Sequence, residues 1–186
     1  TLTVVRDCVF DGDDYSEVEL TANDFTVTTA PGVTLTWNGT LRVASGVTGF
    51  VVEGEMSEAG AGTLIVDGEA TLGKGMIANL EISFEGQVEL RGATVGKVAI
   101  EQGGRLTVPV NATSLIKEGI VSDQGGFADK SGVFLFGGLY GFDPGLYGRD
   151  PFMVVTEGNL WRIVQDPKFT AMAQVGTKIW GIETID

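Results

Sequence analysis

The chain of 186 residues contains no histidine and a single cysteine, Cys8. Histidine is the commonest general base and the commonest transition-metal ligand in proteins. Its absence therefore disfavours Ser-His or Cys-His nucleophile pairs and sites for zinc, copper or haem. A single cysteine cannot form an internal disulfide, and this count fits assembly in a reducing compartment. The sequence predicts neither a histidine-dependent enzyme nor a disulfide-stapled domain.

Long apolar runs and a basic targeting segment are also missing. No stretch approaches the roughly 18 apolar residues of a membrane-spanning helix. The first residues, TLTVVRDCVF, lack the basic region and the long apolar region of a signal peptide. We expect no transmembrane segment, no membrane partner and no export signal.

Positive charge is scarce, because 12 Lys and Arg residues oppose 25 Asp and Glu residues, for a formal net charge of −13. A surface this acidic repels phosphate backbones, so we expect no nucleic-acid partner. Asp11, Asp13 and Asp14 lie in DGDDYSEVE and supply oxygen atoms of the kind that Ca²⁺ binds. Their spacing does not match an EF-hand loop, so a solvated acidic turn is favoured over a calcium site, and no cofactor is predicted.

Glycine, in contrast, is abundant at 28 residues, which is about twice its usual share. Single glycines and Asn-Gly, Asp-Gly or Gly-Gly pairs separate short runs that alternate apolar with small or polar residues. Each run is too short for a helix and has the period of a half-buried strand. The runs are VTLTW, TLRVAS, GFVVEGE, GTLIVDGEATL, LEISFEG, QVELRG, GKVAIEQGG and RLTVPV.

This spacing predicts an all-β fold, in which residues 1–125 form a short parallel β-helix, or solenoid. Coils of about twenty residues would stack so that apolar pairs form a buried ladder. A β-sandwich or jelly roll has similar strand spacing and is the alternative architecture. The expected inward groups are Val33/Leu35, Phe50/Val52, Leu64/Val66, Leu80/Ile82/Phe84, Val98/Ile100 and Leu106/Val108.

Residues 126–186 have a different composition and are rich in aromatic residues and glycine. We expect a smaller β region with a hairpin turning at 157–159, a short helix at 166–176 and a final strand at 176–185. Such a region either closes the apolar end of the solenoid or contacts another chain. The candidate capping or anchoring residues are Phe134, Phe136, Tyr140, Phe142, Tyr147, Phe152 and Trp161.

Pairs of carboxylates along the strands suggest a different chemistry. Sugar hydrolysis needs two carboxylates that flank a cleft. The same spacing also follows the polar phase of an amphipathic strand, which favours a solvent-facing role. The pairs are Glu53/Glu55, Asp67/Glu69 and Glu81/Glu85.

The succession of short, glycine-bounded strands over about residues 26–120 resembles phage structural proteins that carry a short parallel β-helix. The resemblance implies a non-enzymatic virion protein, capsid-decorating or tail-associated, that assembles in the host cytoplasm as a homo-oligomer. A trimer is favoured, and the implied partners are other virion proteins such as a major capsid protein. Two alternatives stay open: a β-helical polysaccharide lyase or hydrolase, and a glycan-binding adhesin module in which Trp37 or Tyr147 stacks on sugars.

Overall fold

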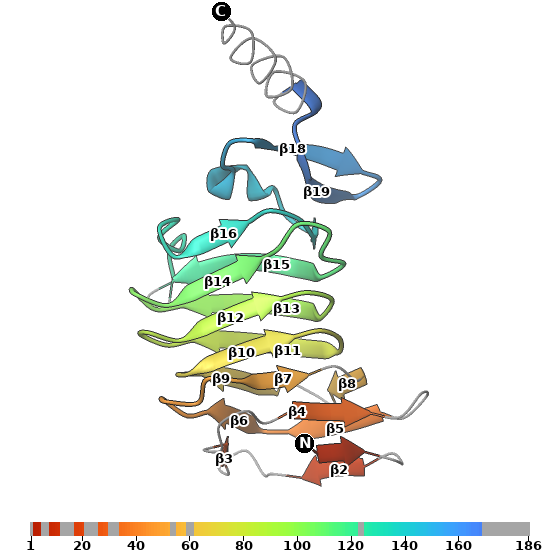
Figure 1. Ribbon diagram of the computed structural model, residues 1–186, viewed down its shortest axis with the longest axis vertical. Helices are drawn as coiled ribbons and strands as arrows, with labels where there is room; N and C mark the ends of the chain where they lie inside the picture. Colours follow the sequence, from red (N-terminus) through yellow and green to blue (C-terminus); the bar gives the residue numbers. More distant parts are fainter. Residues whose placement is uncertain are drawn as a thin grey trace, which may run out of the picture.

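A computed structural model of the chain describes residues 34–52, 55–58, 62–122 and 125–168, and the backbone of four short strands before residue 30. Side chains are described from residue 39 onward, except at 53–61 and 123–124. Within these ranges the chain folds as a β-solenoid whose coils stack along the long axis of the molecule (Figure 1). No helix in the described ranges has the length and apolar character that a bilayer crossing requires.

Three sheets run along the solenoid. Sheet A contains β1 (Leu2–Val4), β4 (Thr26–Thr29), β7 (Phe50–Val52), β10 (Glu69–Leu72), β12 (Gln87–Leu90), β14 (Arg105–Val108) and β16 (Val133–Leu135). Sheet B contains β2 (Cys8–Asp11), β5 (Thr34–Asn38) and β8 (Glu55–Glu58). Sheet C contains β3 (Glu17–Leu20), β6 (Thr40–Val43), β9 (Thr63–Val66), β11 (Met76–Ile82), β13 (Thr94–Ile100), β15 (Leu115–Ser122), β17 (Leu139–Tyr140), β19 (Leu160–Gln165) and β18 (Phe152–Glu157).

Each coil pairs in register with the next. Glu69 pairs with Gln87, which pairs with Arg105, a step of 18 residues each time. The step from Leu106 to its partner Val133 is 27 residues, because a long loop separates β15 from β16. The predicted parallel β-helix is therefore confirmed. The sandwich alternative is wrong, since antiparallel strand pairs in the described chain occur only at β17–β19 and β18–β19.

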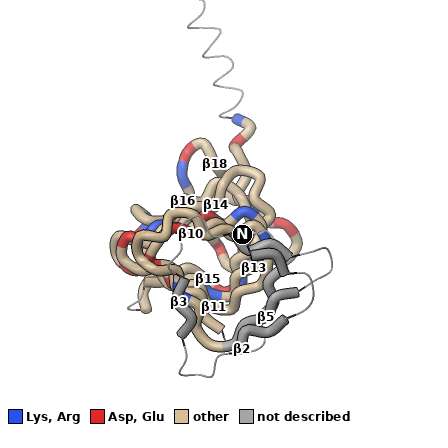
Figure 2. Tube along the Cα trace, turned by 60° about the horizontal axis from the view of Figure 1, so that its bottom comes forward, with Lys and Arg blue, Asp and Glu red and all other residues tan. Residues whose placement is uncertain are grey.

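The core is a ladder of apolar side chains from alternate strand positions. The strands β10, β12 and β14 share one burial pattern, in which the second and fourth residues are buried and the first is exposed. Most expected inward residues from Phe50 to Val108 are buried, and each contributes about 1.5–3 kcal/mol. No described Lys, Arg, Asp or Glu side chain is buried in the core, and Figure 2 marks the positions of these residues along the coils. Val33 lies outside the described residues, and only the backbone of Leu35 is described.

Phe84 is the exception among the expected inward residues. Strand β11 ends at Ile82, and the chain then turns through Glu85, whose φ is +67°. The turn breaks the alternation of the strand, so the Phe84 side chain is 62% exposed and its ring lies against Gly103. The prediction that Phe84 faces the core is wrong for this reason.

The end of the solenoid is closed by residues beyond 125. Strands β16 and β17 extend sheets A and C across the expected boundary, and a 3₁₀ turn at Pro144–Tyr147 follows. The antiparallel hairpin β18–β19 then pairs with β17 and lies beyond the last coil (Figure 1). Its turn at Gly158-Asn159 confirms the predicted hairpin. The predicted final strand at 176–185 and all but the first residues of the predicted helix at 166–176 lie outside the described residues.

Candidate functional site

Three open hollows lie on the outer face of sheet A and on the corner beside it, and all three are lined by Arg105. Two have volumes of about 500 Å³, and the third, over the middle of the sheet, measures about 360 Å³. Their lining is mixed, with acidic, amide, hydroxyl and aromatic groups. This face of the solenoid is therefore the main candidate surface for binding in the described part of the chain.

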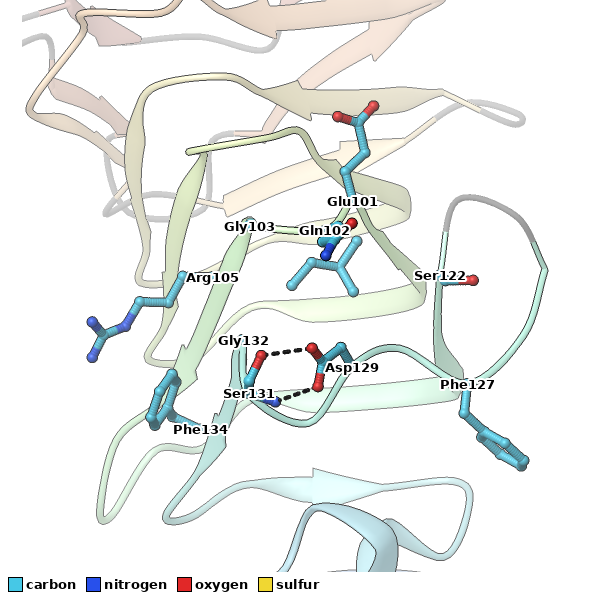
Figure 3. A pocket seen from close by; sticks show the side chains of 12 residues that line it. Glu101, Gln102, Gly103, Arg105, Ser122, Phe127, Asp129, Ser131, Gly132 and Phe134 are labelled. Carbon is cyan, nitrogen blue, oxygen red and sulfur yellow. Dashed lines mark hydrogen bonds between the residues drawn. The ribbon is translucent and has the colours of Figure 1, made fainter.

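The hollow nearest the capped end lies at the corner where sheet C turns into sheet A (Figure 3). Asp129 accepts hydrogen bonds from the backbone N–H of Ser131 at 2.9 Å and from its hydroxyl at 2.7 Å. These bonds lower the pKa of the exposed Asp129 carboxyl group. Arg105 and Phe134 lie at one side and Phe127, 82% exposed, points outward at the other. The polar groups do not converge on one point, as a catalytic site would require.

Arg105 is held by an aromatic ring. Its guanidinium carbon lies 4.4 Å from the centroid of the Phe134 ring, and that of Arg149 lies 4.5 Å from the same centroid. Arg149 is fixed further because it donates to the carbonyl oxygens of Lys130 and Val133. Stacking on a ring orients a guanidinium while leaving its N–H groups free to bind.

The other arginines of the described chain pair with carboxylates. Arg42 binds Asp67 at 2.6 Å and Arg91 binds Glu89 at 2.5 Å, while Arg162 pairs with Glu157 across the cap hairpin. Arg105 and Arg149 have no carboxylate partner among the described residues. Within the described residues, Arg105 and Arg149 are therefore the arginines whose positive charge no carboxylate neutralises, although the chain as a whole has a net charge of −13.

The structure separates some of the predicted carboxylate pairs and regroups others. Asp67, Glu69 and Glu85 line one hollow, but Asp67 is already paired with Arg42. Glu81 is exposed on sheet C, which is a different face of the solenoid. Glu53 lies outside the described residues, and only the backbone of Glu55 is described.

The acidic residues of the disfavoured calcium alternative cannot be compared in space, because most of them lie outside the described residues. Asp11 ends β2, and Asp13 and Asp14 lie outside the described ranges. Elsewhere in the described chain, no three His, Cys, Asp or Glu side chains are grouped as metal ligands.

Two of the candidate anchoring residues are buried. The Tyr140 hydroxyl donates to the carbonyl oxygen of Gly137 at 2.6 Å, and that of Tyr147 donates to Ile120 at 2.9 Å. Burial raises the pKa of both hydroxyl groups. Both side chains therefore stabilise the end of the solenoid from within.

The remaining aromatic candidates are half-buried and pack on one another. The Phe136 and Phe152 ring centroids lie 5.2 Å apart, and the Phe142 ring meets Tyr140 edge-on at 5.7 Å. Phe142, Phe152 and Trp161 also pack against the buried core. In the structure these rings join the hairpin to the last coil.

The opposite face of the hairpin carries an apolar surface that the sequence reasoning missed. Val154 pairs with the buried Ile163 on the inner face, so the neighbouring pairs point outward. Met153 is 38% exposed, and the apolar residues beside it are half-buried. We call this surface the outer cap face; its apolar residues are Met153, Val155, Leu160 and Val164, and the ion pair of Arg162 with Glu157 lies on the same face. The alternation within FMVVTE and LWRIVQ would have predicted it.

Comparison of the chain with protein-family models, with curated proteins and with solved structures finds no match. The functional argument therefore rests on the geometry of the two surfaces described above, the outer face of sheet A and the outer cap face.

Proposed function

We propose that this chain is a non-enzymatic structural component of a virion, and that it acts by assembling in many copies through its capped end. The observation that carries the proposal is the outer cap face, where exposed apolar side chains lie beside one ion pair at one end of a rod. The assignment to a virion extends the resemblance to phage β-helix proteins, and the assembly function rests on the cap.

Two properties of the cap favour assembly. Strand β18 is the last strand of sheet C, and no described strand pairs with its outer edge. An unpaired edge next to exposed apolar side chains is a template for pairing with another chain. The solenoid behind it is rigid, because fully buried side chains such as Leu80 and Leu106 fill its interior. A rigid rod loses little conformational entropy on docking, which strengthens many-copy binding.

The test is the occupancy of assembled particles. The chain would be co-expressed with the structural genes of the genome that encodes it, and the sedimented particles would be assayed for bound chain. Met153→Asp places a charge on the outer cap face and should lower occupancy by about tenfold or more.

Val110→Asp is the matched control, because Val110 is 51% exposed and lies in the loop after β14, away from the cap. It should leave occupancy unchanged. The proposal is wrong if the wild-type chain is absent from particles, or if both variants bind as well as the wild type with their folds intact.

A further inference from the structure

The outer face of sheet A presents an ordered column of charges. Glu69, Gln87 and Arg105 occupy equivalent first positions in β10, β12 and β14 and pair with one another in register. All three are exposed. Adjacent coils are about 4.8 Å apart, so the column reads acid, amide and base over about 10 Å.

This order of charges is complementary to the same order running in the opposite direction, because acid then faces base at both ends. A half-turn about an axis along β12 reverses the order of the coils and keeps each column facing itself. Glu69 then faces Arg105 of the second copy, and Gln87 faces its own equivalent. We infer that two copies of the chain pair antiparallel through the outer faces of sheet A, in a twofold, isologous interface.

The neighbouring column supports the same axis. Val51, Thr71, Glu89, Thr107 and Phe134 follow one another across the sheet. Under the half-turn the apolar Val51 faces the Phe134 ring of the second copy, and the two threonines face each other. In this column Glu89 meets its own equivalent, and the ion pair of Glu89 with Arg91 offsets the repulsion between the two carboxylates.

Arg105 fits the hollow it would enter. The ring of Phe134 orients its guanidinium, and no described carboxylate of its own chain pairs with it. The hollow of about 500 Å³ beside β10 is lined by Glu69 and Glu85, and Arg105 of the same chain lines its far side, two coils away from Glu69. In the antiparallel pair each Arg105 reaches this hollow on the other copy, where a carboxylate satisfies its free N–H groups.

The pair does not use the outer cap face, which it leaves exposed at both ends. It is therefore independent of the proposed docking through the cap. Because the contacts of this interface are mainly between exposed charged and polar side chains, we expect a weak dimer whose affinity falls as salt is added.

The experiment is a charge exchange measured by sedimentation velocity on the full chain. Arg105→Glu and Glu69→Arg should each weaken dimerisation by about tenfold or more, because each substitution breaks both symmetric contacts. The double variant restores opposite charges and should recover dimerisation at low salt.

Lys97→Glu and Glu81→Arg, on the exposed surface of sheet C, are the matched controls and should leave dimerisation unchanged. The inference is overturned by a wild-type chain that stays monomeric or forms a trimer, by single variants that dimerise normally, or by a double variant that fails to recover. Circular dichroism of every variant would confirm that its β-solenoid is intact.

Discussion

Gly86 packs two coils together at the corner between β11 and β12. A Cβ atom at this position would lie 2.1 Å from the carbonyl oxygen of Val66 in the previous coil. Because the contact is with backbone, no side-chain rotation can relieve it. We predict that Gly86→Ala lowers the free energy of unfolding by about 2–3 kcal/mol, measured by chemical denaturation.

Gly126→Ala is the control for that substitution. A Cβ atom at Gly126 would lie 3.7 Å from its nearest neighbour, the Ser122 hydroxyl oxygen, which is an ordinary contact. Its unfolding free energy should stay within about 0.5 kcal/mol of the wild type. Equal changes in the free energy of unfolding at the two positions would contradict the close contact between Gly86 and the previous coil.

The buried tyrosines predict how stability depends on pH. Burial in the folded state raises the pKa of Tyr140 and Tyr147, whereas a tyrosine in the unfolded chain has a pKa of about 10. Above that pH the unfolded state loses protons that the folded state keeps, so stability is full below pH 10 and falls above it. The slope should approach about 1.4 kcal/mol per pH unit for Tyr140 and be smaller for Tyr147. Denaturation curves between pH 8 and pH 11 would measure it, and unchanged stability would contradict burial of these hydroxyl groups.

Alternation predicted most buried residues correctly, because in a solenoid strand every second side chain faces the interior. It failed at Phe84 because alternation holds only within a strand. Strand β11 stops before Phe84, where the chain turns through the left-handed backbone at Glu85. The role of Arg105 could not be predicted from the sequence for a related reason. Its neighbours Gln87 and Phe134 are 18 and 29 positions away in sequence (105 − 87 and 134 − 105), and only the coil register brings them together.

At the level of the element, the cap hairpin depends on its two-residue turn. Gly158 has a φ of +63°, and nothing lies within 4 Å of the place where its Cβ would be. The cost of a substitution should therefore come from the backbone alone. We predict that Gly158→Ala destabilises the protein by about 1 kcal/mol, Gly158→Asn by less and Gly158→Val by more, in thermal unfolding. A ranking set by side-chain volume alone, with Asn worse than Ala, would contradict this account.

The strands themselves were only partly predictable. Glycine-bounded runs marked β5 to β7 and β9 to β14. Strands β15 and β16 were not recognised, because SLIKEGIVS contains a central Lys-Glu-Gly and GVFLF lies in a stretch dominated by aromatic residues. Apolar alternation looks the same in parallel and antiparallel strands. The choice between a solenoid and a sandwich was therefore settled by parallel pairing between residues 16 or more positions apart, which no local pattern contains.

On the scale of the whole molecule, the described part is a rod with three different surfaces: a charged column on sheet A, an exposed polar face on sheet C, and a cap with exposed apolar side chains beside one ion pair. The sequence predicted that the aromatic region would close the rod or bind a partner. In the structure the aromatic rings pack inward and close the rod, whereas Met153 is turned outward on the face through which we propose docking. That division depends on the pairing of β18 with β19, and so it could not be assigned from composition.

The most direct test of the account is the molar mass of the intact chain in solution, measured by light scattering over a wide range of concentration. A rod that works by assembly should form a complex of defined mass, larger than one chain, as concentration rises. A mass that stays at one chain at every concentration, for a protein with its β-solenoid intact, would contradict the claim that this molecule acts through contacts between copies.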